Sequence, residues 1–82
     1  MPTIFEEDGY RVMVFIRGEH PPPHVHVFHA GTFIAVLISL ADAEYRGDWS
    51  GRKPQSREIK RAVKVVRDNL QLCLFVWNRY HA

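Results

Sequence analysis

The C-terminal stretch SREIKRAVKVVRDNLQLCLFVWNR, residues 56–79, carries the clearest structural pattern in the chain. Its apolar residues recur at spacings that alternate between four and three, which is the repeat of one face of an α-helix. Ser56 is a candidate N-cap, and Glu58 complements the positive end of the helix dipole. We predict one helix over residues 56–79, about 36 Å long. Its apolar stripe consists of Ile59, Val63, Val66, Leu70, Cys73, Trp77 and Tyr80.

The first forty residues alternate apolar and polar side chains, as short β-strands do. Asp8-Gly9 is a strong turn signal between two such runs, and Ala30-Gly31 is a second candidate turn. These turns favour an antiparallel meander. The expected strands cover residues 10–16, 24–29 and 32–40, with a short edge strand near residues 2–5.

Residues 41–55 form a long connection in which a short strand near residues 44–49 could be hidden. Trp49 in this connection is expected either to plug the core or to form a binding surface. The fold class is therefore α+β: a small antiparallel sheet of three to four strands with one long C-terminal helix packed across one face. The 82 residues make a single domain, with the strand meander and its His/Pro loop in residues 1–40, the connection in 41–55 and the helix in 56–79.

The single cysteine, the acidic N-terminus and the short apolar runs favour a cytoplasmic location. Cys73 is the single cysteine, so no intramolecular disulfide can form, and its place on the apolar stripe predicts a core residue in a reducing environment. The N-terminus carries Glu6, Glu7 and Asp8 where a secretory signal would need basic and then apolar residues. The longest apolar run, residues 70–77, is far shorter than the roughly 20 residues that span a bilayer. We expect a cytoplasmic protein without a membrane partner.

Positive charge is concentrated at the start of the predicted helix. Residues 52–67 hold seven basic residues and one acidic residue, a net charge of +6, whereas the rest of the chain holds four basic and eight acidic residues, a net charge of −4. This asymmetry indicates an acidic partner, either nucleic acid or an acidic protein surface, although a solvated helix face explains the same pattern. The candidate nucleic-acid-binding residues are Arg52, Lys53, Arg57, Lys60, Arg61, Lys64 and Arg67.

The second half of the predicted helix has more apolar surface than a small sheet can cover. Leu72, Phe75 and Val76 fall outside the apolar stripe. We therefore expect a homodimer or a heteromer with its contact in the 70–77 region. The alternative is a helix that the N-terminus and the long connection wrap within one chain.

A proline-flanked histidine cluster, His20-Pro-Pro-Pro-His24-Val-His26, runs into the second predicted strand. His24 and His26 are two residues apart, so both point from one face of the strand, and the intervening valines point to the helix side. His20 could fold back towards them, with Glu19 beside it. His29 has the opposite parity and is not expected to belong to the cluster.

Three chemistries fit this cluster, and the sequence leaves them open. Imidazoles with a carboxylate suit a divalent transition metal such as zinc, with His20, His24, His26 and Glu19 as ligands. Metal-free ribonuclease-like catalysis would use His24 and His26 as base and acid on RNA, with His20 in support. Imidazole and Phe28 could instead bind bases or phosphate. A structural role, in which the histidines tie the proline loop to carbonyl groups, is the fourth reading.

The segment Glu19-His20-Pro21-Pro22-Pro23-His24-Val25-His26-Val27 resembles the E/D-H-x-P-P-H-x-H signature of a family of small bacterial proteins, catalogued as domain of unknown function 4160. Pro21 occupies the variable position of that signature. The opening Pro2-Thr3-Ile4, the segment Gly51-Arg-Lys-Pro54 and a terminal helix ending in residues 74–78 are also similar to the family.

The resemblance implies a small α+β fold of prokaryotic origin. It also implies that the protein is encoded in an operon beside a second small protein, and such pairs are suspected to form toxin–antitoxin-like modules. We therefore expect a heteromer with this small operon partner. The family has no established activity to transfer. The histidines and prolines that match the signature are His20, Pro22, Pro23, His24 and His26, and the resemblance assigns no role to any of them. Our leading hypothesis is an interaction protein of such a pair that acts on or near RNA.

Overall fold

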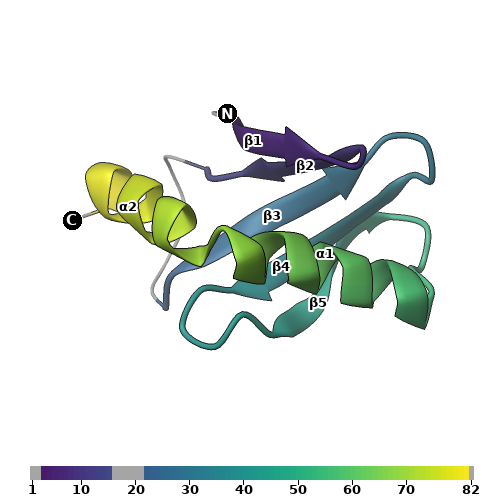
Figure 1. Cartoon of the computed structure of the whole chain (residues 1–82). Coiled ribbons are helices and arrows are strands. Elements are labelled where there is room, and N and C mark those ends of the chain that lie inside the picture. The colour runs from purple at the N-terminus through teal and green to yellow at the C-terminus, as the bar shows by residue number, and fades with distance from the viewer. Residues whose placement is uncertain (1–2, 16–21, 82) are drawn as a thin grey trace.

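The computed structural model describes residues 3–15 and 22–81, and of Trp49 and Ser50 it describes only the main chain. Five antiparallel strands form one sheet in the order β1-β2-β3-β4-β5, and two helices cover one of its faces (Figure 1). The strands are β1 (Thr3–Glu7), β2 (Tyr10–Met13), β3 (His24–His29), β4 (Ile34–Ser39) and β5 (Tyr45–Gly51); the helices are α1 (Ser56–Asp68) and α2 (Leu70–His81).

The α+β class and the antiparallel meander are confirmed, but the expected number of strands is wrong. The fifth strand comes from the connection, where the sequence only indicated a short hidden strand. β5 carries the polar sequence YRGDWSG, with two glycines, so its alternation is weak. It pairs with β4 through an irregular register, in which Val36 lies opposite Asp48 and Ile38 opposite Tyr45. Pairing with β4, rather than its own pattern, makes this segment a strand.

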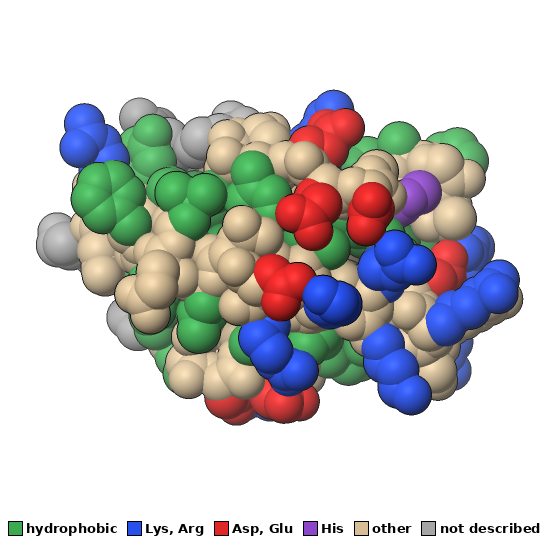
Figure 2. Space-filling model, in the orientation of Figure 1, with side chains coloured by type: hydrophobic (Ala, Val, Ile, Leu, Met, Phe, Trp, Pro, Cys, Tyr) green, Lys and Arg blue, Asp and Glu red, His purple; other side chains and the backbone are tan. Residues whose placement is uncertain are grey.

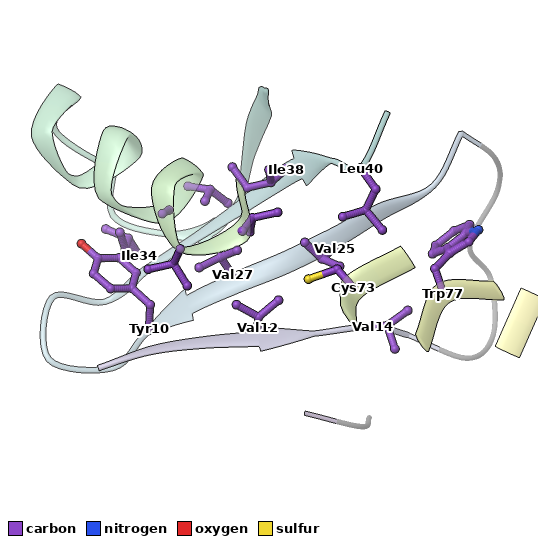
Figure 3. Close-up of a cluster of buried hydrophobic side chains, with 14 residues drawn as sticks. Tyr10, Val12, Val14, Val25, Val27, Ile34, Ile38, Leu40, Cys73 and Trp77 are labelled. Atoms are coloured by element: carbon purple, nitrogen blue, oxygen red, sulfur yellow. The ribbon is translucent and has the colours of Figure 1, made fainter. Parts of the chain in front are cut away.

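The Asp8-Gly9 turn between β1 and β2 is present as predicted. Asp8 has a φ of 54° and Gly9 a φ of 81°, the left-handed pair that a two-residue hairpin of type I′ requires. β3 has the predicted bounds, and Val25 and Val27 on it are fully buried beneath the helices. Figure 3 shows these valines within the buried cluster between the sheet and the helices.

The prediction of one continuous helix is wrong, because Asn69 separates α1 from α2. In a regular helix the Asn69 N–H would bond to the Val65 carbonyl. Instead the Asn69 side-chain amide donates to that carbonyl at 2.9 Å, and its main-chain N–H donates to the Val66 carbonyl at 3.0 Å. The side chain thus replaces the main-chain donor, and α2 continues in a new direction (Figure 1).

The break changes which helical residues reach the core. α1 buries Ala62, Val65 and Val66 against the sheet, and α2 buries Cys73 and Trp77. Of the predicted stripe, only Val66, Cys73 and Trp77 are therefore buried. The remaining stripe residues are half-buried Ile59, Val63 and Leu70, and exposed Tyr80.

The first turn of α1 differs by one residue from the predicted cap. The helix begins at Ser56, but Gln55 is the N-cap, with an extended φ of −83° and ψ of 158°. The Glu58 carboxylate accepts a hydrogen bond of 2.8 Å from the Gln55 main-chain N–H. Glu58 is consequently buried against the start of its own helix. Neither helix in the described part of the chain is long and apolar enough to cross a membrane.

Candidate functional site

The predicted histidine pair lies in a packed group of rings that joins β3 and α2 to the segment that follows β2. The His26 ring contacts Phe15 with ring centroids 4.1 Å apart, and the His24 ring lies 5.5 Å from His26 and 5.2 Å from Trp77. His81 stacks on Trp77 at 3.9 Å. We call these five residues the aromatic cluster. Because His26 is only 4% exposed, its ring is a packing element of this cluster.

His24 is the more accessible member of the pair. It begins β3, is half-buried, and its Nδ1–H donates a hydrogen bond of 3.0 Å to the Pro22 carbonyl oxygen. It also lines a mostly apolar pocket of about 290 Å³ together with Pro23, Leu37 and Arg46. Arg46, which the sequence did not single out, is thus a basic residue that lines the same pocket as His24.

The metal ligands predicted from the sequence are only partly placed. His20 and Glu19 lie outside the described residues, as do Pro2, Ile16 and the side chain of Trp49. Among residues 3–15 and 22–81, no three His, Cys, Asp or Glu side chains are arranged to hold a metal ion. His24 and His26 would need further ligands from outside these ranges, so zinc binding stays a prediction.

The basic residues of the connection and α1 are largely compensated by carboxylates. Figure 2 shows the Lys and Arg side chains over α1 with acidic side chains between them. The ion pairs are Arg52 with Glu58, Arg61 with Asp8 at 3.2 Å, Lys64 with Asp68 at 2.6 Å and Arg67 with Glu44 at 3.7 Å. Lys53, Arg57 and Lys60 have no ion pair within the described ranges. The uncompensated charge thus gathers near the start of α1.

An exposed aromatic side chain accompanies these cations. Phe33, in the β3–β4 turn, is 69% exposed and has a φ of 54°, which is unusual for a bulky residue. The Arg52 main-chain N–H donates to the Phe33 carbonyl at 2.8 Å. Gly51 permits this contact, because a Cβ atom there would collide with the same carbonyl. We call Phe33, Arg52, Lys53, Arg57 and Lys60 the basic end.

A polar pocket of about 370 Å³ opens beside the basic end. We call it the His29 pocket. The sheet contributes Tyr10 and His29, the β3–β4 turn contributes Thr32, the β1–β2 turn contributes Asp8, and α1 contributes Arg57, Glu58 and Arg61. The His29 ring meets Tyr10 edge to face at 4.5 Å, and its Nδ1 shares a hydrogen bond of 3.2 Å with the Thr32 hydroxyl.

Comparison with models of known protein families gives a match to "Domain of unknown function (DUF4160)" over residues 9–78. The chain belongs to this family. Its DUF4160 domain includes β2 to β5, α1 and most of α2, and therefore the basic end and most of the aromatic cluster. Neither the curated proteins nor the solved structures gave a match to the chain.

The DUF4160 fold does not bring the predicted histidine pair together with the predicted basic residues of the connection and α1. His24 lies at the α2 end of β3, whereas His29 at the other end faces Arg57 and Arg61 of α1. A six-residue strand spans roughly 17 Å. Among the histidines that the structure describes, His29 lies nearest to the basic residues of α1, and the parity argument had set it aside. Its opposite parity, which brings it to the helix side, was the signal that could have found it.

Proposed function

We propose that this DUF4160 domain binds single-stranded nucleic acid, with RNA favoured, through the basic end, as one member of a toxin–antitoxin-like pair. The observation that carries the proposal is the exposed Phe33 ring beside uncompensated cations. The pairing with an operon partner rests on the family resemblance alone. Binding rather than cleavage is proposed, because His26 is buried and the histidine pair lies at the opposite end of β3.

The conformation of Phe33 supports a role in binding. A left-handed φ in a non-glycine residue costs about 1–3 kcal/mol, and residues held in this way concentrate at functional sites. Here Gly51 and the Arg52 N–H hold the Phe33 main chain in place. Folding does not bury the ring, so it remains available to a ligand.

The surroundings of Phe33 suit a single strand. An unstacked base can stack on an aromatic ring, which contributes about 1–3 kcal/mol per base. Lys53, Arg57 and Lys60 could then neutralise the adjoining phosphates. If these three residues release three counterions from a single strand, a plot of the logarithm of the binding constant against the logarithm of the salt concentration should have a slope of about −2.

Fluorescence anisotropy with a labelled oligouridine of about 12 nucleotides tests this proposal. Phe33→Ala should weaken binding by about 5- to 150-fold, which corresponds to the loss of one stacked base. Lys64→Gln is the matched control, because Lys64 is already paired with Asp68, and it should change affinity less than about twofold. Wild-type protein that does not bind at about 50 mM salt, or Phe33→Ala protein that binds like wild type, would refute the proposal.

A second candidate function is protein–protein docking through α2. Leu72 and Phe75 are one helical turn apart, and they are 45% and 64% exposed. Figure 2 shows hydrophobic side chains gathered at the α2 end of the molecule. This exposure supports the predicted homodimer or operon heteromer. A Phe75→Glu variant should stay monomeric in analytical ultracentrifugation at concentrations where wild type dimerises; wild type that is monomeric throughout would leave only the heteromer.

Metal binding remains the other alternative for the histidines. It predicts a stoichiometric divalent metal in tag-free protein, lost in His24→Ala but kept in His29→Ala. Elemental analysis decides between this and a packing role. A packing role predicts no bound metal and a lower free energy of unfolding for His26→Ala.

A further inference from the structure

The His29 pocket is lined by a tyrosine that the fold holds in place through its ring. Tyr10 is 7% exposed, and its ring closes one end of the hydrophobic core (Figure 3). Its hydroxyl lines the pocket and has no hydrogen-bond partner within residues 3–15 and 22–81. The hydroxyl is therefore a donor on the wall of the pocket that a ligand with an acceptor oxygen can use. Burial and the Glu58 carboxylate raise the pKa of Tyr10, which keeps it a donor at neutral pH.

Further donors converge on the same pocket. Arg57 lines it and has no ion pair among the described residues, so its guanidinium is available to an anion. Thr32 and His29 contribute a hydroxyl and an imidazole, held together by their mutual hydrogen bond. Phosphate oxygens suit this set, because they accept bidentate bonds from Arg and single bonds from hydroxyl groups.

The two carboxylates of the pocket are already engaged. Glu58 is paired with Arg52 and accepts the Gln55 N–H, and Asp8 is paired with Arg61. With Arg52 included, three guanidinium groups face two carboxylates, and one positive charge remains. That balance suits a bound anion, while the carboxylates limit how much negative charge the pocket accepts.

We propose that the His29 pocket binds a terminal phosphate monoester of the nucleic-acid strand, through the Tyr10 hydroxyl and the Arg57 guanidinium. This rests on the proposed function, because the same strand stacks on Phe33 at the adjoining basic end. Thr32 lines the pocket and Phe33 follows it in the chain, so the two contacts are adjacent. The pocket volume of about 370 Å³ has room for a phosphate and its ribose. A terminal phosphate fits a recess of this kind, because it is bonded to the nucleic acid through only one of its oxygen atoms, whereas an internal phosphate is bonded through two.

The test compares oligoribonucleotides of one sequence that end in a 5′-phosphate, a 3′-phosphate or hydroxyl groups only. Wild type should bind one phosphorylated form about tenfold more tightly than the hydroxyl form, as expected for one charge-assisted contact. The preferred end identifies whether the phosphate is 5′ or 3′. Tyr10→Phe keeps the buried ring and should reduce this preference to less than about threefold, with affinity for the hydroxyl form unchanged.

Tyr45→Phe is the matched control, because the Tyr45 hydroxyl is bonded to Asp48 on β5 and does not line the pocket. It should keep the full preference. Arg57→Gln, at an exposed position, should also reduce the preference if Tyr10→Phe does not fold. Because Arg57 belongs to the basic end as well, this variant should bind the hydroxyl form more weakly, and the ratio of the two affinities is the readout. Equal wild-type affinity for all three strands overturns the inference and leaves the proposed function standing. A preference that survives both pocket variants also overturns it, and no binding to any strand refutes both proposals.

Discussion

The Nε2 atom of His81 lies 2.8 Å from the main-chain carbonyl oxygen of Phe15, across 66 residues of sequence. His81 also stacks on Trp77 at 3.9 Å, so the last turn of α2 is attached to the segment that follows β2. His81→Ala should therefore lower the free energy of unfolding by about 1–2 kcal/mol. Urea unfolding measures the change. Arg79→Ala in the same turn is the control, and an equal loss in both variants would contradict a specific role for His81.

The ion pair at the start of α1 should make stability depend on pH. The Arg52 guanidinium, and then the Gln55 main-chain N–H, lower the pKa of Glu58 below its ordinary value of 4.5. A carboxylate with a lowered folded pKa stabilises the protein above its unfolded pKa, and this contribution is lost as pH falls through the folded pKa. Stability should therefore decrease below about pH 4.5.

Glu58→Gln isolates this effect. The variant should be less stable than wild type at pH 7, and the difference should shrink as the pH falls below 4. Glu7→Gln, at an exposed position of β1, is the control and should follow the wild-type profile. Urea unfolding at several pH values gives the comparison; a constant difference between Glu58→Gln and wild type at all pH values would argue against the ion pair.

We expect a substitution at Gly9 to destabilise the protein, in part because the His29 ring lies against this turn. A Cβ atom at Gly9 would lie 2.7 Å from His29 Nε2, and the φ of 81° already disfavours alanine. Gly9→Ala should cost about 1–2 kcal/mol from the backbone alone, with a further cost from the collision. A double-mutant cycle separates the two, since in a His29→Ala background only the backbone cost should remain. Equal costs in both backgrounds would show that the ring moves away freely.

Cys73 should be inert in the folded protein. It is fully buried, and burial raises the pKa of its thiol to about 11. At pH 8 the thiolate fraction is then on the order of one in a thousand, before access is considered. A chromogenic disulfide reagent should react at the rate of unfolding in buffer and within seconds in denaturant. Rapid reaction in buffer would mean that the contact of α2 with the sheet opens readily.

Several elements followed from the sequence because their causes are local. Asp8-Gly9 supplies the left-handed pair of a tight hairpin wherever it occurs. The alternation in residues 24–29 gave both the bounds of β3 and the burial of Val25 and Val27. Asn69 was missed because the apolar repeat continues across it, and only its side-chain bond to Val65 divides the helix.

The α+β class, the family and the start of α1 could be predicted from the sequence, since periodicity, turn chemistry and the histidine–proline motif are properties of neighbouring residues. Which charges meet depends on how the strands and helices pack. Asp8, Glu44 and Glu58 compensate basic residues that looked like one continuous patch. Strand order and the bend at Asn69 place His24 and His29 in different surroundings. Ion pairs, burial and pockets depend on distances between segments that are far apart in the chain, and a linear pattern does not contain those distances.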